Sequence, residues 1–351
     1  LGVHARAKEV LDGTNNNFAR VAIGSYCICR GVGYRTVYLY SILNNQDGGA
    51  QETRVRSHDE HDAVFSPRSS PTLPPPPRRQ PPCGMSQCCQ LHRHGIIQIV
   101  SYDLIGDIHG YSEPLEELLA KLGYYNTDGF YRHADRRVIF LGDFIDRGPN
   151  QREVIEIVRP MIDSGTALSV MGNHEFNAIA WHTEDPDNPY QYLREHTARH
   201  MRQHQAFLDA YQGTADHGEL VEWFRTLPMW LDLGELRVVH ACWDDLLMQA
   251  LLVNYPTLND YLDDELLVKA SRKDALEHEA VEILLKGKEV ELPKGHSFLD
   301  KDGHARHAVR IRWFDADAIT YQAAFLGPEK ARSHIPEDPV GADHIIQYSH
   351  D

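Results

Sequence analysis

Four short polar motifs, each placed directly after a hydrophobic run with the character of a β-strand, constrain the fold of this chain more than any other feature. They are GDIHG at residues 106–110, GDFIDRG at 142–148, GNHE at 172–175 and the VVHA segment that holds His240. Strands that alternate with helices form an α/β sheet, and the loops at the carboxyl ends of its strands gather at one edge. We therefore expect all four motifs to meet at a single edge of one sheet.

The pattern between the motifs also indicates an α/β fold. Leucines at helical spacing between residues 115 and 122 predict an amphipathic helix that ends at Gly123. The polar, histidine-rich segment 184–222 is interpreted as a helical insertion over the sheet. Short apolar runs rich in β-branched residues predict strands at 96–105, 137–141, 167–170 and 236–240.

Residues 1–84 differ in character from the rest of the chain. They carry 10 Lys and Arg against 7 Asp and Glu, whereas residues 85–351 carry 25 against 44. Eight prolines lie between residues 66 and 82, and because proline removes a backbone donor and fixes φ, this stretch is predicted to be a semi-rigid linker. We expect residues 1–84 to be a disordered or weakly structured extension, in which residues 34–43 have the composition of a short strand. Residues 85–351 are expected to form the main domain.

Met85 is the first methionine of the chain. The extension is therefore interpreted either as a tail or as upstream readthrough.

The composition argues against several classes of partner. A formal charge of −16 at pH 7 disfavours nucleic-acid polymers and anionic membranes. The sequence contains no run of about eighteen apolar residues, so no membrane-spanning helix is predicted. Six cysteines without a repeating spacing predict free thiols in a reducing compartment, and we expect a cytoplasmic protein. The sequence indicates no particular oligomeric state.

The donors in the four motifs suit a metal site. Carboxylate, imidazole and amide groups gathered at one sheet edge favour divalent ions such as Mn²⁺, Fe²⁺ or Zn²⁺. The glycines beside them let the backbone turn sharply and let a phosphate approach closely. Each motif alone is compatible with an ordinary polar turn, but the occurrence of four in this order strongly indicates a metal site.

GDIHG, GDFIDRG and GNHE, together with His240, resemble the motifs of the calcineurin-like metallophosphoesterase superfamily. The DRG form is similar to the phosphoprotein phosphatase (Ser/Thr phosphatase-like) branch, and the later segment KGHSFLDKDGHARHAVRIRWF looks like bacterial members. The resemblance covers roughly residues 97–245 and implies a four-layer α/β/β/α sandwich. It also implies two divalent metal ions as cofactors, with Mn²⁺ as the first choice and Fe or Zn as alternatives.

The resemblance implies a role for each metal-site residue. Asp107 and His109 would bind the first metal, and Asp143 would bridge both metals. Asn173 and His240 would bind the second metal.

Further residues would act on the phosphoryl group. By the same resemblance His174 would be the general acid toward the leaving oxygen, with Asp146 holding its ring. Arg147 would contact the phosphoryl oxygens, which a guanidinium can bind with two hydrogen bonds. A second phosphate-binding arginine is expected opposite it, and Arg310 and Arg312 are candidates because they alternate along an apparent strand.

The family pattern contains one more histidine, in a GH motif after a hydrophobic strand. His296, His344 and His350 are weak candidates, because none both follows an apolar strand and stands beside a glycine. We therefore expect that the chain stops near the family's terminal strand, that the sandwich lacks its C-terminal strands and that the second metal is held one ligand short.

We predict a metal-dependent phosphoesterase that hydrolyses phosphomonoesters by in-line attack of a hydroxide that bridges two metals. The DRG motif favours phosphoprotein Ser/Thr substrates, and a phosphorylated small molecule is a further possibility. One alternative is a dinucleoside polyphosphate hydrolase of the diadenosine tetraphosphate type, for which Trp181, Tyr190 or Tyr192 would stack a base. Another is a truncated, non-catalytic fragment with an incomplete second site. Four histidines are expected to form a solvated face rather than a metal site: His182, His196, His200 and His204.

Overall fold

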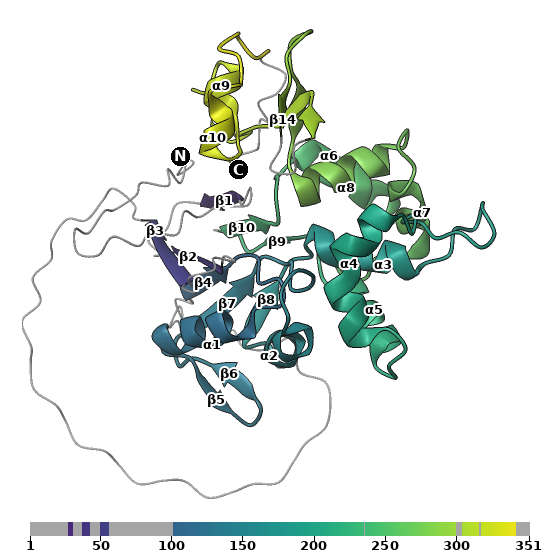
Figure 1. The fold of residues 1–351 in the computed structure, drawn as a ribbon. Coiled ribbons are helices and arrows are strands. Elements are labelled where there is room, and N and C mark those ends of the chain that lie inside the picture. The colour runs from purple at the N-terminus through teal and green to yellow at the C-terminus, as the bar shows by residue number, and fades with distance from the viewer. Residues whose placement is uncertain are drawn as a thin grey trace, which may run out of the picture.

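The computed structural model describes residues 101–234, 236–299, 304–315 and 317–341, together with three strands nearer the N-terminus (Figure 1). Those strands are β1 (Cys27–Arg30), β2 (Val37–Ile42) and β3 (Ala50–Val55).

Several sequence predictions fall outside these residues. The proline-rich linker at 66–82 is one of them, and the candidate ligands His344 and His350 are two more. The strand expected at residues 34–43 corresponds to β2.

The larger sheet has five strands in the order β3-β2-β4-β7-β8. Its core is formed by β4 (Ser101–Ile105), β7 (Arg136–Phe140) and β8 (Ala167–Ser169), which run parallel and correspond to three of the predicted strands. β2 pairs parallel with β4, and β3 pairs antiparallel with β2 at the edge. Because parallel strands end at the same edge, the GDIHG, GDFIDRG and GNHE loops begin there together.

A second, antiparallel sheet contains the strand that precedes His240. Its order is β1-β10-β9, where β9 is Trp230–Asp232 and β10 is Leu236–Val239. The prediction that all four motifs follow strands of one sheet is therefore wrong for His240. The physical reason is that only a short connection separates β9 from β10, and such a connection joins antiparallel neighbours without a crossover helix.

The two sheets pack against each other. Leu104, Ile139 and Val170 of the larger sheet form one buried cluster with Leu236 and Val238 of β10. Successive residues of a strand point to opposite faces, so the neighbours of these side chains face the other way. Burial between the sheets brings the end of β10, and with it His240, to the edge where the parallel strands end.

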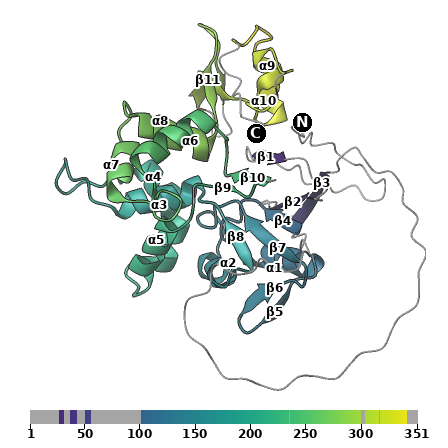
Figure 2. The ribbon, with the colours of Figure 1, turned by 180° about the vertical axis from the view of Figure 1, so that it is seen from behind.

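Two helices cover the opposite face of the larger sheet, as Figures 1 and 2 show from two sides. They are α1 (Ser112–Lys121) and α2 (Gln151–Asp163). Val138 and Phe140 of β7 share a buried cluster with Leu115 of α1. The α/β class and the layered sandwich expected from the sequence are confirmed.

Six further helices lie together beside the sheets (Figure 1). The first of them, α3, begins within the GNHE motif, and α4 and most of α5 lie in the segment interpreted as a helical insertion. The six are α3 (Asn173–His182), α4 (Ala198–Tyr211), α5 (His217–Arg225), α6 (Asp245–Asn254), α7 (Asp264–Ala270) and α8 (Leu276–Lys286).

Short elements complete the described chain. The Trp313 Nε1–H donates to the Ala241 carbonyl oxygen at 3.2 Å, which attaches the C-terminal segment beside His240. The pairs are β5 (Tyr125–Thr127) with β6 (Phe130–Arg132), β11 (Glu289–Glu291) with β14 (Ala308–Arg310), and β12 (Phe298–Leu299) with β13 (Ala305–Arg306); the helices are α9 (Tyr321–Ala324) and α10 (Glu329–Arg332).

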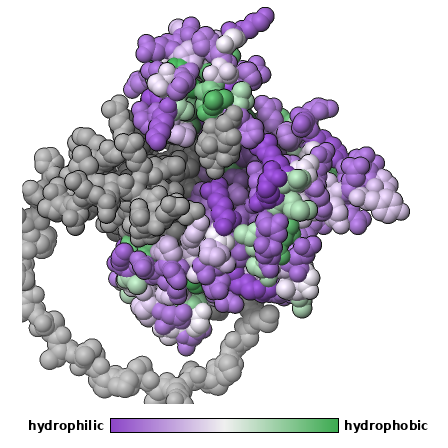
Figure 3. All heavy atoms as spheres, in the orientation of Figure 1, coloured by the Kyte–Doolittle hydropathy of each residue, from purple (hydrophilic) through white to green (hydrophobic). Residues whose placement is uncertain are grey.

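The described surface shown in Figure 3 is mostly hydrophilic, with hydrophobic side chains visible in small groups. Among the described residues no helix has the length and apolar character needed to cross a membrane. Cys242 is a buried, free thiol, as expected of a chain without a disulfide framework.

Candidate metal centre

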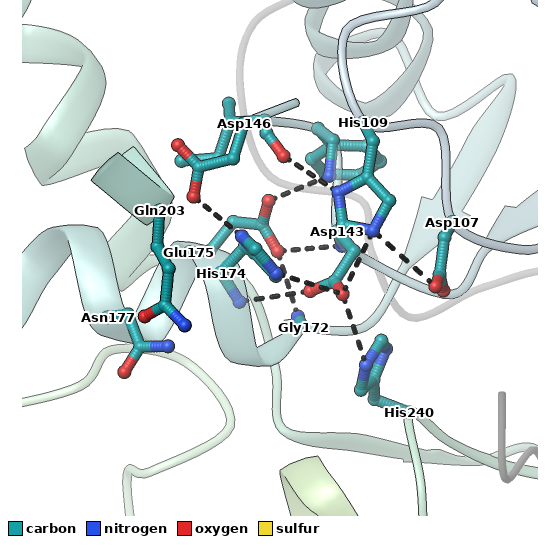
Figure 4. Close-up of polar contacts among 12 residues, drawn as sticks. Asp107, His109, Asp143, Asp146, Gly172, His174, Glu175, Asn177, Gln203 and His240 are labelled. Atoms are coloured by element: carbon teal, nitrogen blue, oxygen red, sulfur yellow. Dashed lines mark hydrogen bonds and ion pairs between the residues drawn. The ribbon is translucent and has the colours of Figure 1, made fainter. Parts of the chain in front are cut away.

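Asp143 lies at the centre of the site and is 2% exposed (Figure 4). Its Oδ2 atom lies 3.7 Å from Nε2 of His109 and 3.6 Å from Nε2 of His240. Two groups of potential ligands share this carboxylate: one contains His109 and His174, and the other contains Asp107 and His240, with the ligand atoms of each group within 4.8 Å of one another. A carboxylate common to two such groups is what a bridged pair of cations requires.

The two histidines are oriented as metal ligands. Nδ1 of His109 lies 2.9 Å from the Ile145 carbonyl oxygen, and Nδ1 of His240 lies 2.5 Å from that of Leu141. A carbonyl oxygen only accepts, so each Nδ1 carries a proton, and each Nε2 faces Asp143, where it is the ring atom available to a metal. Nε2 of His109 is also buried without a hydrogen-bond partner. Such an acceptor is unfavourable unless a cation binds it, so these residues fit divalent metals.

The expected first ligand set is also brought together. Nε2 of His109 lies 3.6 Å from Oδ2 of Asp107, in addition to its approach to Asp143. Asn173 begins α3 and directly precedes His174, whose N–H donates to Oδ1 of Asp143 at 2.9 Å. The structure therefore brings Asp107, His109 and His240 together around the Asp143 carboxylate, and Asn173 directly precedes a residue whose backbone binds that carboxylate.

The loop backbone adopts a conformation that most residues avoid. His109, Asp143, Asp146 and Arg147 have positive φ angles of 47°, 55°, 68° and 67°. Such residues concentrate at functional sites, where surrounding bonds must compensate for the strain. Here the N–H groups of Ile108 and His109 both donate to the Asp143 carbonyl oxygen, at 3.0 and 2.8 Å. The GDIHG and GDFIDRG loops thus hold each other in place.

Glu175 fastens the GNHE loop to the GDFIDRG loop. Its buried carboxylate accepts from the N–H groups of Asp143 at 2.8 Å, Phe144 at 2.8 Å and Gly172 at 3.0 Å. Burial, followed by the Asp143 charge, raises the pKa of Glu175 against the effect of these donors. A Cβ atom at Gly172 would overlap the Asp143 carboxylate, which explains the glycine. Sequence analysis assigned Glu175 no role, although its place in the first turn of a helix was a signal.

His174 lies between two carboxylates. Its Nδ1 atom is 2.6 Å from Oδ2 of Asp146, and its Nε2 atom is 4.0 Å from Oδ2 of Asp143. Burial alone would lower the pKa of His174, but the charge of Asp143 and the hydrogen bond to Asp146 raise it to about 9. A protonated imidazole held in this way can donate a proton to a leaving oxygen. The expected contact between His174 and Asp146 is present.

Asp146 has a second imidazole partner that sequence analysis missed. Nδ1 of His204 lies 2.9 Å from Oδ1 of Asp146, and both residues are buried. Burial would raise the pKa of Asp146, but the hydrogen bonds from His174 and His204 lower it to about 2. The prediction of a solvated histidine face is wrong for His204, because this residue lies on the buried face of α4.

A sequence signal for this burial existed. Phe207, Leu208 and Tyr211 follow His204 at spacings of three, four and seven residues, and all four are buried. That spacing defines one helix face, so His204 belongs to the apolar side of α4. Burial also lowers the pKa of His182, to about 4, beside the rings of its histidine neighbours.

Arg147 is exposed in the GDFIDRG loop, and its charge acts on His174. The other two candidate arginines belong to the C-terminal part of the chain. Arg310 belongs to β14 and approaches Glu289 at 3.9 Å, and Arg312 follows that strand. In the described part of the chain, no hydrogen bond or ion pair joins either side chain to the metal-site residues. His296, a weak candidate for the missing ligand, is exposed.

The three residues proposed to stack on a base differ in their burial and in their ring contacts. Trp181 is buried and stacks on His196 with 3.7 Å between ring centroids, and His196 stacks on Tyr192 at 4.2 Å. Tyr190 is 99% exposed. Trp181 is therefore occupied within the fold, whereas the tyrosines remain at the surface.

Comparison with known proteins identifies the family. Residues 101–323 match the family model of the calcineurin-like phosphoesterases, a span that includes all four motif loops. The chain belongs to this family. The members of this family are metallophosphoesterases, which belong to the phosphoric ester hydrolases.

Several bacterial relatives carry the name bis(5'-nucleosyl)-tetraphosphatase PrpE. The protein from Oceanobacillus iheyensis is 32% identical over 140 residues, which are 40% of this chain and 54% of the relative. That from Bacillus subtilis is 32% identical over 145 residues, 40% of this chain and 57% of the relative. The chain thus spans about half the length of these curated relatives.

Two of the similar solved structures overlap with smaller parts of the chain. A putative diadenosine tetraphosphatase shares 31% identity over 22% of this chain and 30% of its own, with a TM-score of 0.17. A metallophosphoesterase from Sphaerobacter thermophilus shares 26% identity over 37% of this chain and 42% of its own, with a TM-score of 0.24.

Proposed function

We propose that this chain hydrolyses dinucleoside polyphosphates at its metal centre. The observation that carries the proposal is the similarity to bis(5'-nucleosyl)-tetraphosphatases from several bacteria, at 32% identity over 140 residues in the first of them. The clustering of ligands around Asp143 supports phosphoester chemistry in general, and the relatives support this substrate class in particular.

The phosphoprotein Ser/Thr substrate favoured by the DRG motif stays a prediction. Asp146 and Arg147 of that motif act on the phosphoryl group and its leaving oxygen, not on the rest of the substrate. The motif is therefore compatible with both substrate classes, and the similarity to nucleotide hydrolases favours the dinucleoside polyphosphate.

We propose two divalent cations, with Mn²⁺ as the first choice and Fe or Zn as alternatives. Asp107, His109 and Asp143 would hold one, and Asp143, Asn173 and His240 the other. When bound, such ions polarise phosphoryl oxygens and make water a nucleophile at neutral pH.

Three further side chains bind the phosphoryl group, protonate the leaving oxygen and orient the general acid. Arg147 orients the phosphoryl oxygens with its planar fork of donors. His174 holds a proton on Nε2 and donates it to the leaving oxygen, because Asp146 occupies its Nδ1 side. His204 keeps the Asp146 carboxylate from rotating by binding its second oxygen.

We also propose that residues 85–351 form the metallophosphoesterase domain, with 184–222 as its insertion and 1–84 as an extension. The family match over residues 101–323 supports the position of this domain.

Turnover of three substrates in parallel tests the function. We expect kcat/KM with Mn²⁺ to be at least about tenfold higher for diadenosine tetraphosphate than for a phosphoserine peptide, since the relatives act on nucleotides. p-Nitrophenyl phosphate serves as a general phosphomonoester. A preference for the peptide would overturn the substrate assignment. Loss of turnover on all three, with one equivalent of metal or none bound, would favour the non-catalytic fragment.

A further inference from the structure

Arg194, in the segment between α3 and α4, is held by neutral groups. Its Nη1 atom donates to Oδ1 of Asn177 at 2.6 Å, and its Nη2 atom donates to Oε1 of Gln203 at 3.1 Å. Its backbone N–H donates to the Ala180 carbonyl oxygen at 3.0 Å. The guanidinium therefore has a defined orientation, bridging α3 and α4, without a counter-charge from these partners.

The absence of a carboxylate partner distinguishes Arg194 from three other arginines that are not fully exposed. Within the described ranges, no Asp or Glu oxygen forms an ion pair with this guanidinium. It is half-buried, and its Nε atom is not among the described buried atoms that lack a partner. Other arginines of the helical region do form ion pairs: Arg152 with Asp216 at 2.7 Å, Arg225 with Asp264 at 2.9 Å and Arg272 with Asp187 at 2.9 Å.

The two amides that hold Arg194 lie on the general-acid side of the metal centre. Asn177 is three residues after His174 and shares its face of α3. Gln203 directly precedes His204, the second partner of Asp146. Figure 4 shows Asn177 and Gln203 on the side of the site where Asp146 and His174 lie.

The ligands Asp107 and His240 lie on the opposite side in the same view. Electrostatics agrees with this placement of Arg194. Burial lowers the pKa of Arg194, and the charge of Asp146 is the first to oppose that effect.

We propose that Arg194 binds the phosphates of the leaving nucleotide and so selects polyphosphate substrates over simple phosphomonoesters. This inference rests on the proposed function, because it concerns how the chain binds the part of a dinucleoside polyphosphate that lies beyond the cleaved bond. The leaving group lies on the side of His174, which protonates its oxygen. The two amides that hold Arg194 lie on that side, and its guanidinium is half-buried rather than fully enclosed.

The chemistry of the two substrate classes explains the selection. A phosphoserine releases a neutral alcohol, whereas a dinucleoside polyphosphate releases a nucleotide that carries several negative charges. A guanidinium binds phosphate oxygens with two parallel hydrogen bonds. Because neutral amides orient Arg194, no internal ion pair has to be broken before it binds phosphate.

Substitution of Arg194 tests the proposal through the ratio of the kcat/KM values for two substrates. We expect Arg194→Gln to lower kcat/KM for diadenosine tetraphosphate by about 10- to 100-fold more than for p-nitrophenyl phosphate, the range for a lost charged hydrogen bond. Arg194→Lys should restore part of the difference. The matched control is Arg199→Gln, which removes an exposed arginine of α4 and should leave the ratio unchanged. An equal loss on both substrates would show that Arg194 is only a clamp between helices.

A second variant keeps the arginine in place. Asn177→Asp retains an acceptor for Nη1 but adds a carboxylate, so it should lower the same ratio by neutralising the guanidinium. An unchanged ratio in a folded Asn177→Asp protein would contradict the proposal.

A binding measurement separates this inference from the proposed function. Calorimetry with inorganic tripolyphosphate should give at least about tenfold weaker affinity for Arg194→Gln than for the unmodified chain, with orthophosphate affected less. If the unmodified chain does not cleave diadenosine tetraphosphate, the proposed function fails. The Arg194 inference is then decided by tripolyphosphate alone, and equal affinities would overturn it.

Discussion

The strand-end loops and the helices α3 and α4 meet at Asp146, but their contacts there join residues that lie at different distances along the chain. In the loops, a histidine and a carboxylate stand two residues apart in GDIHG, and backbone hydrogen bonds between adjacent loops hold them. In the helices, His204 reaches Asp146 across 58 residues of sequence, and Arg194 reaches Asn177 across 17. In the proposed mechanism the loops supply most of the metal ligands, whereas the helices orient the acid and bind the leaving phosphates.

The largest expected effect lies in the loops. Asp143→Asn should reduce bound metal from two equivalents toward none and lower kcat/KM by on the order of a thousand-fold, because both ligand groups share this carboxylate. Metal content by mass spectrometry and turnover together check this. Asp135→Asn, at an exposed loop position, is the control. A fully active variant with two metals would show that Asp143 does not bridge them.

The next effect lies where the two regions meet. His174→Ala should keep both metals but slow turnover by about 10²- to 10⁴-fold, the usual contribution of a general acid. The loss should grow as the pKa of the leaving group rises, which a series of substituted phenyl phosphates measures. A uniform loss across that series would exclude proton donation by His174.

A smaller effect is expected from the helical side. His204→Ala should lower kcat by about 10- to 100-fold with little change in KM, because a supporting residue orients a catalytic one. His204→Asn retains a donor near the position of Nδ1 and should recover much of the activity. If both variants behave alike and only thermal stability falls, His204 serves packing and the two regions are less coupled than the geometry suggests.

The smallest effect concerns pH and the helices alone. Burial lowers the pKa of His182 from an ordinary value of 6.5 to about 4, so between these values the unfolded chain binds a proton that the folded chain does not. Folding stability should therefore fall as the pH drops below about 6.5, with the loss complete near pH 4. For a half-buried ring we expect about 1 kcal/mol or less. Urea unfolding at pH 7 and pH 5 measures this, and His182→Gln should reduce the difference. An unaltered pH dependence in that variant would assign the effect to other groups.

The comparison also shows where inference from sequence succeeded. Asp107, His109 and Asp143 were predicted as neighbours because each comes directly after a parallel strand, and parallel strands end at one edge of their sheet. His240 was also predicted to lie at this edge, and it does, although it was assigned to the wrong sheet. Its strand lies in the second sheet, and packing of Leu236 and Val238 against the larger sheet brings its end to the same edge.

The sequence by itself determined the α/β class, the family and the ligands within the motifs, because the spacing in each motif sets which donors follow a strand. Only the tertiary structure decided the partners of Asp146 and of the Arg194 guanidinium. These depend on how α4 packs against the strand-end loops and α3, and such packing joins residues whose separation in sequence has no fixed geometric meaning. An imidazole on an apolar helix face and an arginine without a counter-charge acquire their roles only from what the fold places beside them.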